Sequence, residues 1–265
     1  MSIYAIGDLH LAQSIDKPMD IFGVKWLNYM EQIKESWGKK ITDADTVIIP
    51  GDISWATYLE EAVLDFKFID LLPGRKIILK GNHDYWWTTM TKLESFLKEN
   101  NFNTLEFLQN NSFEIENNYL CGTRGWKCPG DDDFSDEDKK IYERELQRLE
   151  LSLKSIEKKQ GKKPDIKSSI KSGKKSDEES DYSCDTDLNN CADKDIIVAL
   201  HYPPFNSKWE PSEFIEIMKK HFVKTCIYGH IHGDAYKNAF QGDLDGVSFR
   251  LVSSDYLKFE PLKLV

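Results

Sequence analysis

Five short apolar runs, each followed by an acidic or histidine-containing motif, constrain the fold of this chain more than any other feature. The runs are Ile3–Ile6, Thr46–Pro50, Lys76–Lys80, Ile196–Leu200 and Thr225–Tyr228. They are rich in Ile and Val, and Gly, Asp or Pro bounds each of them. Continuous apolar runs of this length predict strands that are buried on both faces of a sheet.

Segments with helical periodicity lie between the predicted strands. Apolar residues recur at intervals of three or four at Trp26, Met30, Ile33 and Trp37, at Leu59, Val63, Phe66 and Ile69, and at Met90, Leu93 and Leu97. Gly38 is a plausible end for the first of these helices. Because strands and helices alternate, the expected fold class is α/β or layered α+β.

The middle of the chain has a different composition. Ser135 followed by Asp138 predicts a capping box. A helix with an apolar stripe follows, formed by Tyr142, Leu146, Leu149, Leu153 and Ile156. From about residue 158 to 195 the chain is composed mainly of Lys, Ser, Asp and Glu. We therefore expect one domain over residues 1–265, with a helical and low-complexity insertion at about 135–195 that is disordered or loosely ordered from about 158.

Composition limits the classes of partner. The net charge of −10 argues against coating of nucleic acids, although a small anionic substrate remains compatible if metal ions reverse the local charge. No stretch approaches the roughly 20 apolar residues that span a bilayer, and we expect no signal peptide. Five cysteines in a long chain do not predict a disulfide framework. We expect a cytoplasmic protein with no membrane partner; the sequence leaves the oligomeric state open.

Every predicted strand ends in potential metal ligands. Asp8 and His10 follow the first strand, Gly51-Asp52 the second, Gly81-Asn82-His83-Asp84 the third, His201 the fourth and Gly229-His230-Ile231-His232 the fifth. Any one of these groups could be a turn or a cap. Their repetition at five strand ends favours a shared site, because ligands in open α/β sheets bind at the carboxyl ends of strands. A glycine beside a ligand allows a sharp turn and a close approach of the backbone.

The types of ligand favour a pair of divalent metal ions. Carboxylates, imidazoles and one amide oxygen suit Mn, Fe or Zn better than soft Cu(I). Seven side chains exceed the four ligands of a typical zinc site, but they suit two ions that share a carboxylate. Such a pair lowers the pKa of a bridging water, so that a hydroxide is available to attack phosphorus, and it offsets charge on the phosphoryl oxygens.

The ordered set of motifs from residue 8 to residue 232 resembles the calcineurin-like metallophosphoesterase superfamily. This resemblance implies a four-layer α/β/β/α sandwich. It also implies that one metal is held by Asp8, His10, Asp52 and His232, and the other by Asp52, Asn82, His201 and His230, with Asp52 as the bridge. His83 would contact the phosphate and protonate the leaving group, and Asp84 would orient His83.

Within the superfamily, the chain more closely resembles a group of bacterial predicted phosphohydrolases. The shared segments are Pro50-Gly51-Asp52-Ile53-Ser54-Trp55, Asn82-His83-Asp84-Tyr85-Trp86-Trp87 and Gly122-Thr123-Arg124-Gly125-Trp126. Protein serine/threonine phosphatases instead carry an Arg shortly after the second motif and a Glu after Asn-His. The chain lacks both features, which argues against that branch. Membership of the bacterial group implies no defined substrate.

Two further features near the motifs have alternative interpretations. Arg124 lies in a Gly-flanked turn and could bind the phosphate of a substrate, or it could be a surface or structural residue. The aromatic residues Trp55, Tyr85, Trp86 and Trp87 could line a pocket or belong to the core.

The leading hypothesis is a dinuclear metal-dependent phosphoesterase that cleaves phosphate mono- or diesters of a small phosphorylated substrate, with His83 as general acid. A non-catalytic metal-binding scaffold of the same fold is one alternative, and the complete ligand set argues against it. A nuclease is the other, and the acidic composition argues against it.

Overall fold

Two mixed β-sheets lie face to face in the computed structural model, which describes residues 1–159 and 194–265. The first sheet has the strand order β11-β1-β2-β3-β4. Its strands are β1 (Ile3–Ala5), β2 (Thr46–Pro50), β3 (Arg75–Leu79), β4 (Leu105–Phe107) and β11 (Leu262–Lys263). β1 to β4 are parallel, and β11 is antiparallel at the edge beside β1.

The second sheet has a similar plan, with the order β5-β6-β7-β8-β10-β9. It consists of β5 (Phe113–Ile115), β6 (Asn118–Thr123), β7 (Asp195–Leu200), β8 (Thr225–Tyr228), β9 (Gly242–Leu244) and β10 (Val247–Leu251). The four central strands are parallel, whereas β5 and β9 pair antiparallel at the two edges. The central parallel strands of both sheets therefore bring their carboxyl ends to one end of the molecule.

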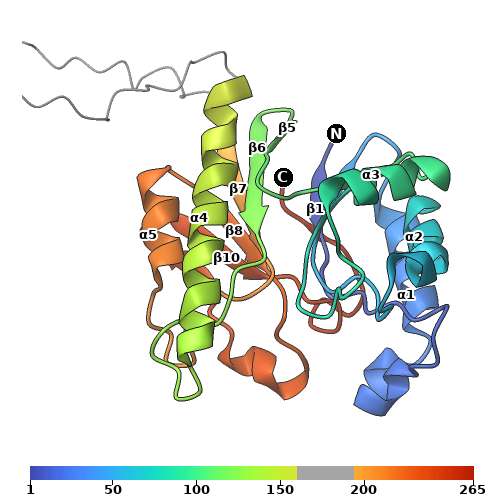
Figure 1. The fold of residues 1–265 in the computed structure, drawn as a ribbon. Helices are drawn as coiled ribbons and strands as arrows, with labels where there is room; N and C mark the ends of the chain where they lie inside the picture. The colour runs from blue at the N-terminus through green and yellow to red at the C-terminus, as the bar shows by residue number, and fades with distance from the viewer. Residues whose placement is uncertain (160–193) are drawn as a thin grey trace, which may run out of the picture.

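Helices cover the outer face of each sheet (Figure 1). The first sheet carries α1 (Tyr29–Lys40), α2 (Val63–Asp70) and α3 (Met90–Glu99), and the second carries α4 (Asp136–Lys159) and α5 (Glu213–Lys220). Short 3-10 helices occupy Met19–Phe22, Val24–Trp26, Leu59–Ala62 and Gly233–Asn238.

Alternation of side chains along the buried strands produces three apolar layers. In β2, Val47 and Ile49 face the helices, whereas Ile48 packs between the two sheets. In β7, Val198 faces the helices of the other half, and Ile197 lies in the same layer between the sheets as Ile48. Because successive residues of a strand point to opposite faces, strands that are apolar throughout can be buried on both sides. The expected four-layer α/β/β/α sandwich is confirmed.

The predicted strands and helices are present, with strand ends within one residue of the prediction. Trp26 and Leu59 lie in 3-10 helices that precede α1 and α2, and the predicted end of the first helix at Gly38 is wrong. α1 continues through Gly38 to Lys40 and ends at Ile41, which is extended. Gly38 is exposed and nothing lies within 4 Å of a Cβ built on it, so no packing contact requires glycine at this position. Lys39 and Lys40 in the last turn favour continuation, because cations stabilise the negative end of the helix dipole.

Helix α4 begins with the predicted capping box. The Ser135 hydroxyl accepts a hydrogen bond from the backbone N–H of Asp138 (3.2 Å), and the Asp138 carboxylate accepts one from the backbone N–H of Ser135 (3.0 Å). The apolar stripe of the helix is buried against the second sheet. The low-complexity segment at 160–193 lies outside the described residues, so the boundaries of the insertion stay a prediction. Within residues 1–159 and 194–265, no helix has the length and apolar character needed to cross a membrane.

Two leucines of α4 provide a test of this packing. Leu149 is fully buried, whereas Leu151 is 52% exposed. We expect Leu149→Ala to lower the free energy of unfolding by about 2–5 kcal/mol, because it removes buried methyl groups and leaves a cavity. Leu151→Ala on the same helix is expected to change it by less than about 0.5 kcal/mol. Urea unfolding followed by circular dichroism measures both values, and equal losses would contradict the helix orientation.

Candidate metal centre

The seven predicted metal ligands converge at the carboxyl ends of the central strands. Asp8, His10, Asp52 and Asn82 follow strands β1, β2 and β3 of the first sheet, and His201, His230 and His232 follow β7 and β8 of the second. The candidate site therefore lies where the two sheets meet. Its acidic and amide ligands come from one sheet, and three of its four imidazoles come from the other.

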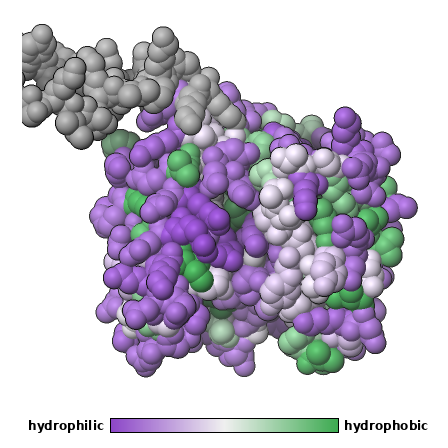
Figure 2. All heavy atoms as spheres, in the orientation of Figure 1, coloured by the Kyte–Doolittle hydropathy of each residue, from purple (hydrophilic) through white to green (hydrophobic). Residues whose placement is uncertain are grey.

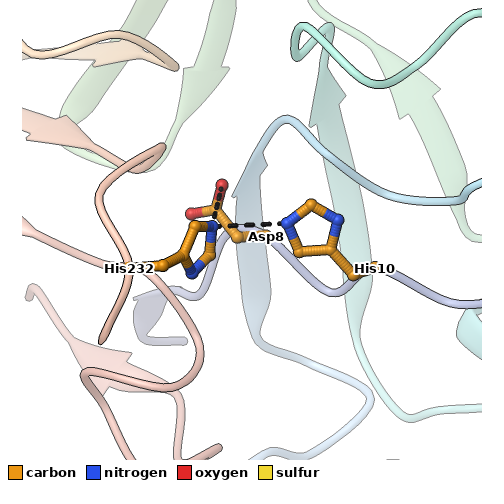
Figure 3. Close-up of side chains that lie close together, drawn as sticks. All are labelled: Asp8, His10 and His232. Carbon is orange, nitrogen blue, oxygen red and sulfur yellow. Dashed lines mark hydrogen bonds and ion pairs between the residues drawn. The ribbon is translucent and has the colours of Figure 1, made fainter. Parts of the chain in front are cut away.

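One group of ligands is formed by Asp8, His10 and His232, drawn in Figure 3. The Nε2 atoms of His10 and His232 lie 3.3 Å apart, and Asp8 Oδ1 lies 3.5 Å from His232 Nε2. The two imidazoles enter from different sheets and turn toward the same carboxylate. Their convergence matches three members of the first predicted metal position.

A second group gathers around the side-chain oxygen of Asn82. Asn82 Oδ1 lies 2.6 Å from His201 Nε2 and 2.8 Å from His230 Nδ1. An amide oxygen and two imidazole nitrogens thus meet at one point, as expected for the second predicted metal position.

The carboxylate of Asp52 lies between the two groups. Its Oδ2 is 3.7 Å from His10 Nε2, and its Oδ1 is 3.6 Å from His201 Nε2. Asp8 also reaches the second group, because its Oδ1 is 3.7 Å from His201 Nδ1. Asp52 therefore faces each group with a different oxygen, and its role as a bridge stays a prediction.

The backbone is held in an unfavourable conformation at several of these residues. Asp8, His10, Asp52 and His230 have φ values of 57°, 47°, 52° and 71°. Residues other than glycine rarely adopt this left-handed region, and such strain persists only where surrounding structure imposes it. The predicted effect of glycine is also visible, because a Cβ at Gly81 would collide with the carboxylate of Asp52.

Electrostatics explain why this set of donors fits cations. Burial and then the charge of Asp8 raise the pKa of Asp52 to about 8. Burial also disfavours the charge of Asp8, but His232, His201 and His10 hold its pKa below the usual value. Burial opposes the charge of His232 as well, yet Asp8 and Asp255 raise its pKa to about 10. Positive charge close to the buried carboxylates therefore stabilises their ionised forms, and divalent ions would supply that charge.

Hydrogen bonds from the far nitrogen fix two of the imidazole rings. His201 Nδ1 lies 3.0 Å from the carbonyl oxygen of Pro50, and His232 Nδ1 lies 2.9 Å from Asp255 Oδ1. Such outer contacts orient metal-binding imidazoles and set their basicity. Sequence reasoning missed Asp255, because it follows no apolar run directly and no glycine or histidine stands beside it. The alternating pattern of β10, which ends four residues earlier, was the available signal.

Asp84 does not make the contact that the resemblance implied. One of its carboxylate oxygens accepts hydrogen bonds from the backbone N–H groups of Asp52 (2.9 Å) and Gly81 (2.7 Å), and the other accepts one from Ile53 (2.8 Å). The buried Nδ1 of His83 has no hydrogen-bond partner among the described residues. Asp84 therefore ties together the two loops that carry Asp52 and Asn82 and leaves the ring of His83 to other contacts.

Some of the aromatic residues near the motifs line a pocket, and others belong to the core. Trp86 is 2% exposed and packs in the core against Phe66, whereas Tyr85 is exposed. Trp55 stacks on His10 with ring centroids 4.8 Å apart and also packs against His83 at 4.4 Å. It helps to line a cavity of about 320 Å³ beside the candidate centre, together with Phe22, Trp26, His10, His83 and His232. Trp55 is thus a pocket residue, and Trp86 is a core residue.

Arg124 lies largely buried outside that cavity. Its guanidinium is 3.4 Å from the buried carboxylate of Glu145 and packs 4.5 Å from the ring centroid of Trp126. The structure gives Arg124 these structural contacts, and substrate binding by Arg124 stays a prediction.

Comparison with known proteins identifies the family of this chain. The family model for calcineurin-like phosphoesterases matches residues 1–234. The chain belongs to this family. Membership supports a hydrolase that acts on phosphoester bonds, and the Asp and His groups described above could bind metal ions. No curated protein matches the chain significantly.

Several solved structures resemble this metallophosphoesterase at low sequence identity. A protein of unknown function from Aquifex aeolicus is 16% identical with a TM-score of 0.46, covering 99% of this chain and 95% of the other. A protein of Thermus thermophilus, TT1561, is 9% identical with a TM-score of 0.47, covering 87% and 81%. A phosphopantetheinyl hydrolase from Mycobacterium tuberculosis is 11% identical with a TM-score of 0.47, covering 100% and 95%.

The contact between Asp255 and His232 leads to a prediction about metal affinity. We expect Asp255→Asn to weaken metal binding by about 10–100-fold, because the ring of His232 loses its charged partner. Asp234→Asn is a matched control, since Asp234 lies two residues from His232 but is exposed and bonded to Lys237. Calorimetric titration with Mn²⁺ measures both affinities. Equal affinity in the wild type and Asp255→Asn would show that the contact does not tune the site.

Proposed function

We propose that this metallophosphoesterase hydrolyses phosphate mono- or diesters of small molecules at a dinuclear metal centre. The observation that carries the proposal is the convergence of the ligand groups around Asp8 and Asn82, with the carboxylate of Asp52 between them. Asp8, His10, Asp52 and His232 would hold one ion, and Asp52, Asn82, His201 and His230 the other. Mn, Fe and Zn all suit this set of donors.

Two bound divalent ions would supply a water of lowered pKa and would offset the charge of the phosphoryl oxygens. The chain itself fixes where these ligands stand. Asp84 holds the loops of Asp52 and Asn82 together, and Pro50 and Asp255 orient the rings of His201 and His232. Little rearrangement of the protein is then needed during the reaction, which is the condition under which charged groups stabilise a transition state well.

We infer that His83 transfers a proton to the departing alcohol. Its ring lines the aromatic cavity beside His10, and its backbone N–H donates to Asp52 Oδ1 (2.8 Å). Burial, followed by the proximity of His201 and Lys17, lowers the pKa of His83 to about 4 in the free protein. A phosphoester anion beside the ring would raise that pKa and favour the protonated form that donates to a leaving group.

The cavity beside the centre supports a small substrate. Its volume of about 320 Å³ accommodates a small-molecule leaving group, and Trp26, Trp55 and Phe22 provide apolar surface for it. An acidic chain with a net charge of −10 is less suited to a polynucleotide, whose phosphates require a basic surface. We also propose that the protein acts in the cytoplasm.

Replacement of His83 tests its proposed role. We expect His83→Ala to lower kcat by about 10²–10⁴-fold on a phosphoester with a poor leaving group, because general acid catalysis is lost. His221→Ala is the matched control, since His221 contacts Glu150 rather than any residue of the centre. Steady-state assays of both Mn-loaded variants give the comparison. Wild-type turnover in His83→Ala would remove this residue from the mechanism.

Metal dependence is tested through Asp52. Chelation should abolish hydrolysis of bis-p-nitrophenyl phosphate and p-nitrophenyl phosphate, and added Mn²⁺ should restore it. We expect Asp52→Asn to lose metal and to lower kcat by about 10³-fold or more, because the amide replaces the shared carboxylate. Metal content by mass spectrometry and circular dichroism distinguish a lost site from a lost fold. A folded, metal-depleted protein with full activity would contradict the proposed function.

A further inference from the structure

A second cavity lies between the end of β3, β6 and α4. It has a volume of about 210 Å³, and its walls include Leu79 and Lys80 at the end of β3, Gly122 and Thr123 of β6, and Arg148 of α4. None of the seven predicted metal ligands lines it. It is also separate from the aromatic cavity, because the two share no lining residue.

Three cationic side chains line this second cavity, but only one carboxylate does. The cations are Lys80, Arg124 and Arg148, and the carboxylate is Glu145. Glu145 Oε1 lies 2.7 Å from Arg148 and 3.4 Å from Arg124, and its other oxygen accepts a hydrogen bond from the Thr123 hydroxyl. Both oxygens of the carboxylate are therefore engaged, and neither forms an ion pair with Lys80.

Two polar groups in the walls have no partner among the described residues. The ammonium group of Lys80 makes no hydrogen bond or ion pair there, although the residue is only partly exposed. The Nε of Arg124 is buried without a hydrogen-bond acceptor. Cationic groups withdrawn from water are costly unless an anion or another acceptor faces them. The cavity is thus short of negative charge in a chain whose net charge is −10.

The rest of the wall suits a polar ligand. Thr88, Gln109 and Asn110 add neutral hydrogen-bonding groups, and Trp87 is fixed by a hydrogen bond from its Nε1 to Gln109 Oε1 (2.6 Å). Strongly hydrophilic surface gathers over α4, the helix that supplies Glu145 and Arg148 (Figure 2). Guanidinium and ammonium groups together bind phosphate or carboxylate oxygens by charge-assisted hydrogen bonds.

Two of the cavity's cations are connected through the backbone to the metal-centre segments. Lys80 directly precedes Gly81-Asn82, and the carbonyl oxygen of Arg124 accepts hydrogen bonds from the backbone N–H groups of His201 (3.0 Å) and Tyr202 (2.9 Å). Two of the three cations are therefore tied through the backbone to segments that carry predicted metal ligands.

We propose that this cavity is an anion-binding site that takes a phosphate or carboxylate group through Lys80, Arg124 and Arg148. The anion comes either from a second charged group on the substrate of the metal centre or from a separate small ion. Only the first of these sources depends on the proposed function, since anion binding by the cavity requires no hydrolysis.

The decisive measurement is the binding of inorganic phosphate to the full chain in the presence of a chelator. Without metal ions the acidic centre does not attract phosphate, so calorimetric binding reports on the cavity. We expect Lys80→Met and Arg148→Met each to weaken phosphate binding by about tenfold or more. The ammonium group of Lys80 makes no polar contact within the described residues, so its replacement should leave the fold intact. Arg144→Met is the control, because Arg144 is an exposed cation one turn away on α4.

A second arm distinguishes the two sources of the anion. In the Mn-loaded chain, fructose 1,6-bisphosphate and fructose 6-phosphate are compared by their dissociation constants. Tighter binding of the bisphosphate that Lys80→Met abolishes assigns the anion to the substrate. Equal binding of both sugars, together with phosphate binding that Lys80→Met weakens, assigns it to a separate ion. Phosphate binding that is absent in the wild type, or unchanged in both cavity variants, overturns the proposal whether or not the protein hydrolyses phosphoesters.

Discussion

Packing of the two sheets against each other is the constraint on which the candidate centre depends. The first sheet supplies Asp8, Asp52 and Asn82, and the second supplies three imidazoles. Neither half holds a complete set of ligands. The apolar layer between the sheets, to which Ile48 and Ile197 contribute, therefore fixes the distances in the centre although it is not part of it. Close packing of such a layer transmits small displacements rather than absorbing them.

The arrangement of strands in two packed sheets determines which features of the fold and the candidate site could be predicted from the sequence. Strands such as β2 and β8 were predictable, because an unbroken apolar run bounded by Gly or Pro is typical of a buried strand. The convergence of the predicted ligands was predictable because these residues follow those runs directly. The assignment of the strands to two sheets instead of one was not available from periodicity, since a buried strand looks the same in either. The division into two sheets was inferred only from the resemblance to a known superfamily.

Residues that act through loops were harder to predict than residues that end strands. Asp255 follows β10 after an irregular segment, so only the folded chain brings it to His232. Asp84 was found, but its role was not, because the sequence cannot show that the backbone amides of Gly81 and Ile53 turn toward its carboxylate. Gly38 was misjudged for a related reason: local composition allows a helix end there, and the packing of Trp37 carries the helix past it.

The left-handed backbone at Asp8, His10, Asp52 and His230 has a consequence for how this protein tolerates change. At each position a glycine would adopt the observed backbone angles with less strain than the aspartate or histidine that is present, even though it would remove a predicted ligand. Inactive sequences can therefore melt at a higher temperature than active ones. Selection for a high melting temperature alone would replace these residues. If an evolving population retains them, selection for the activity of the metal centre is still acting.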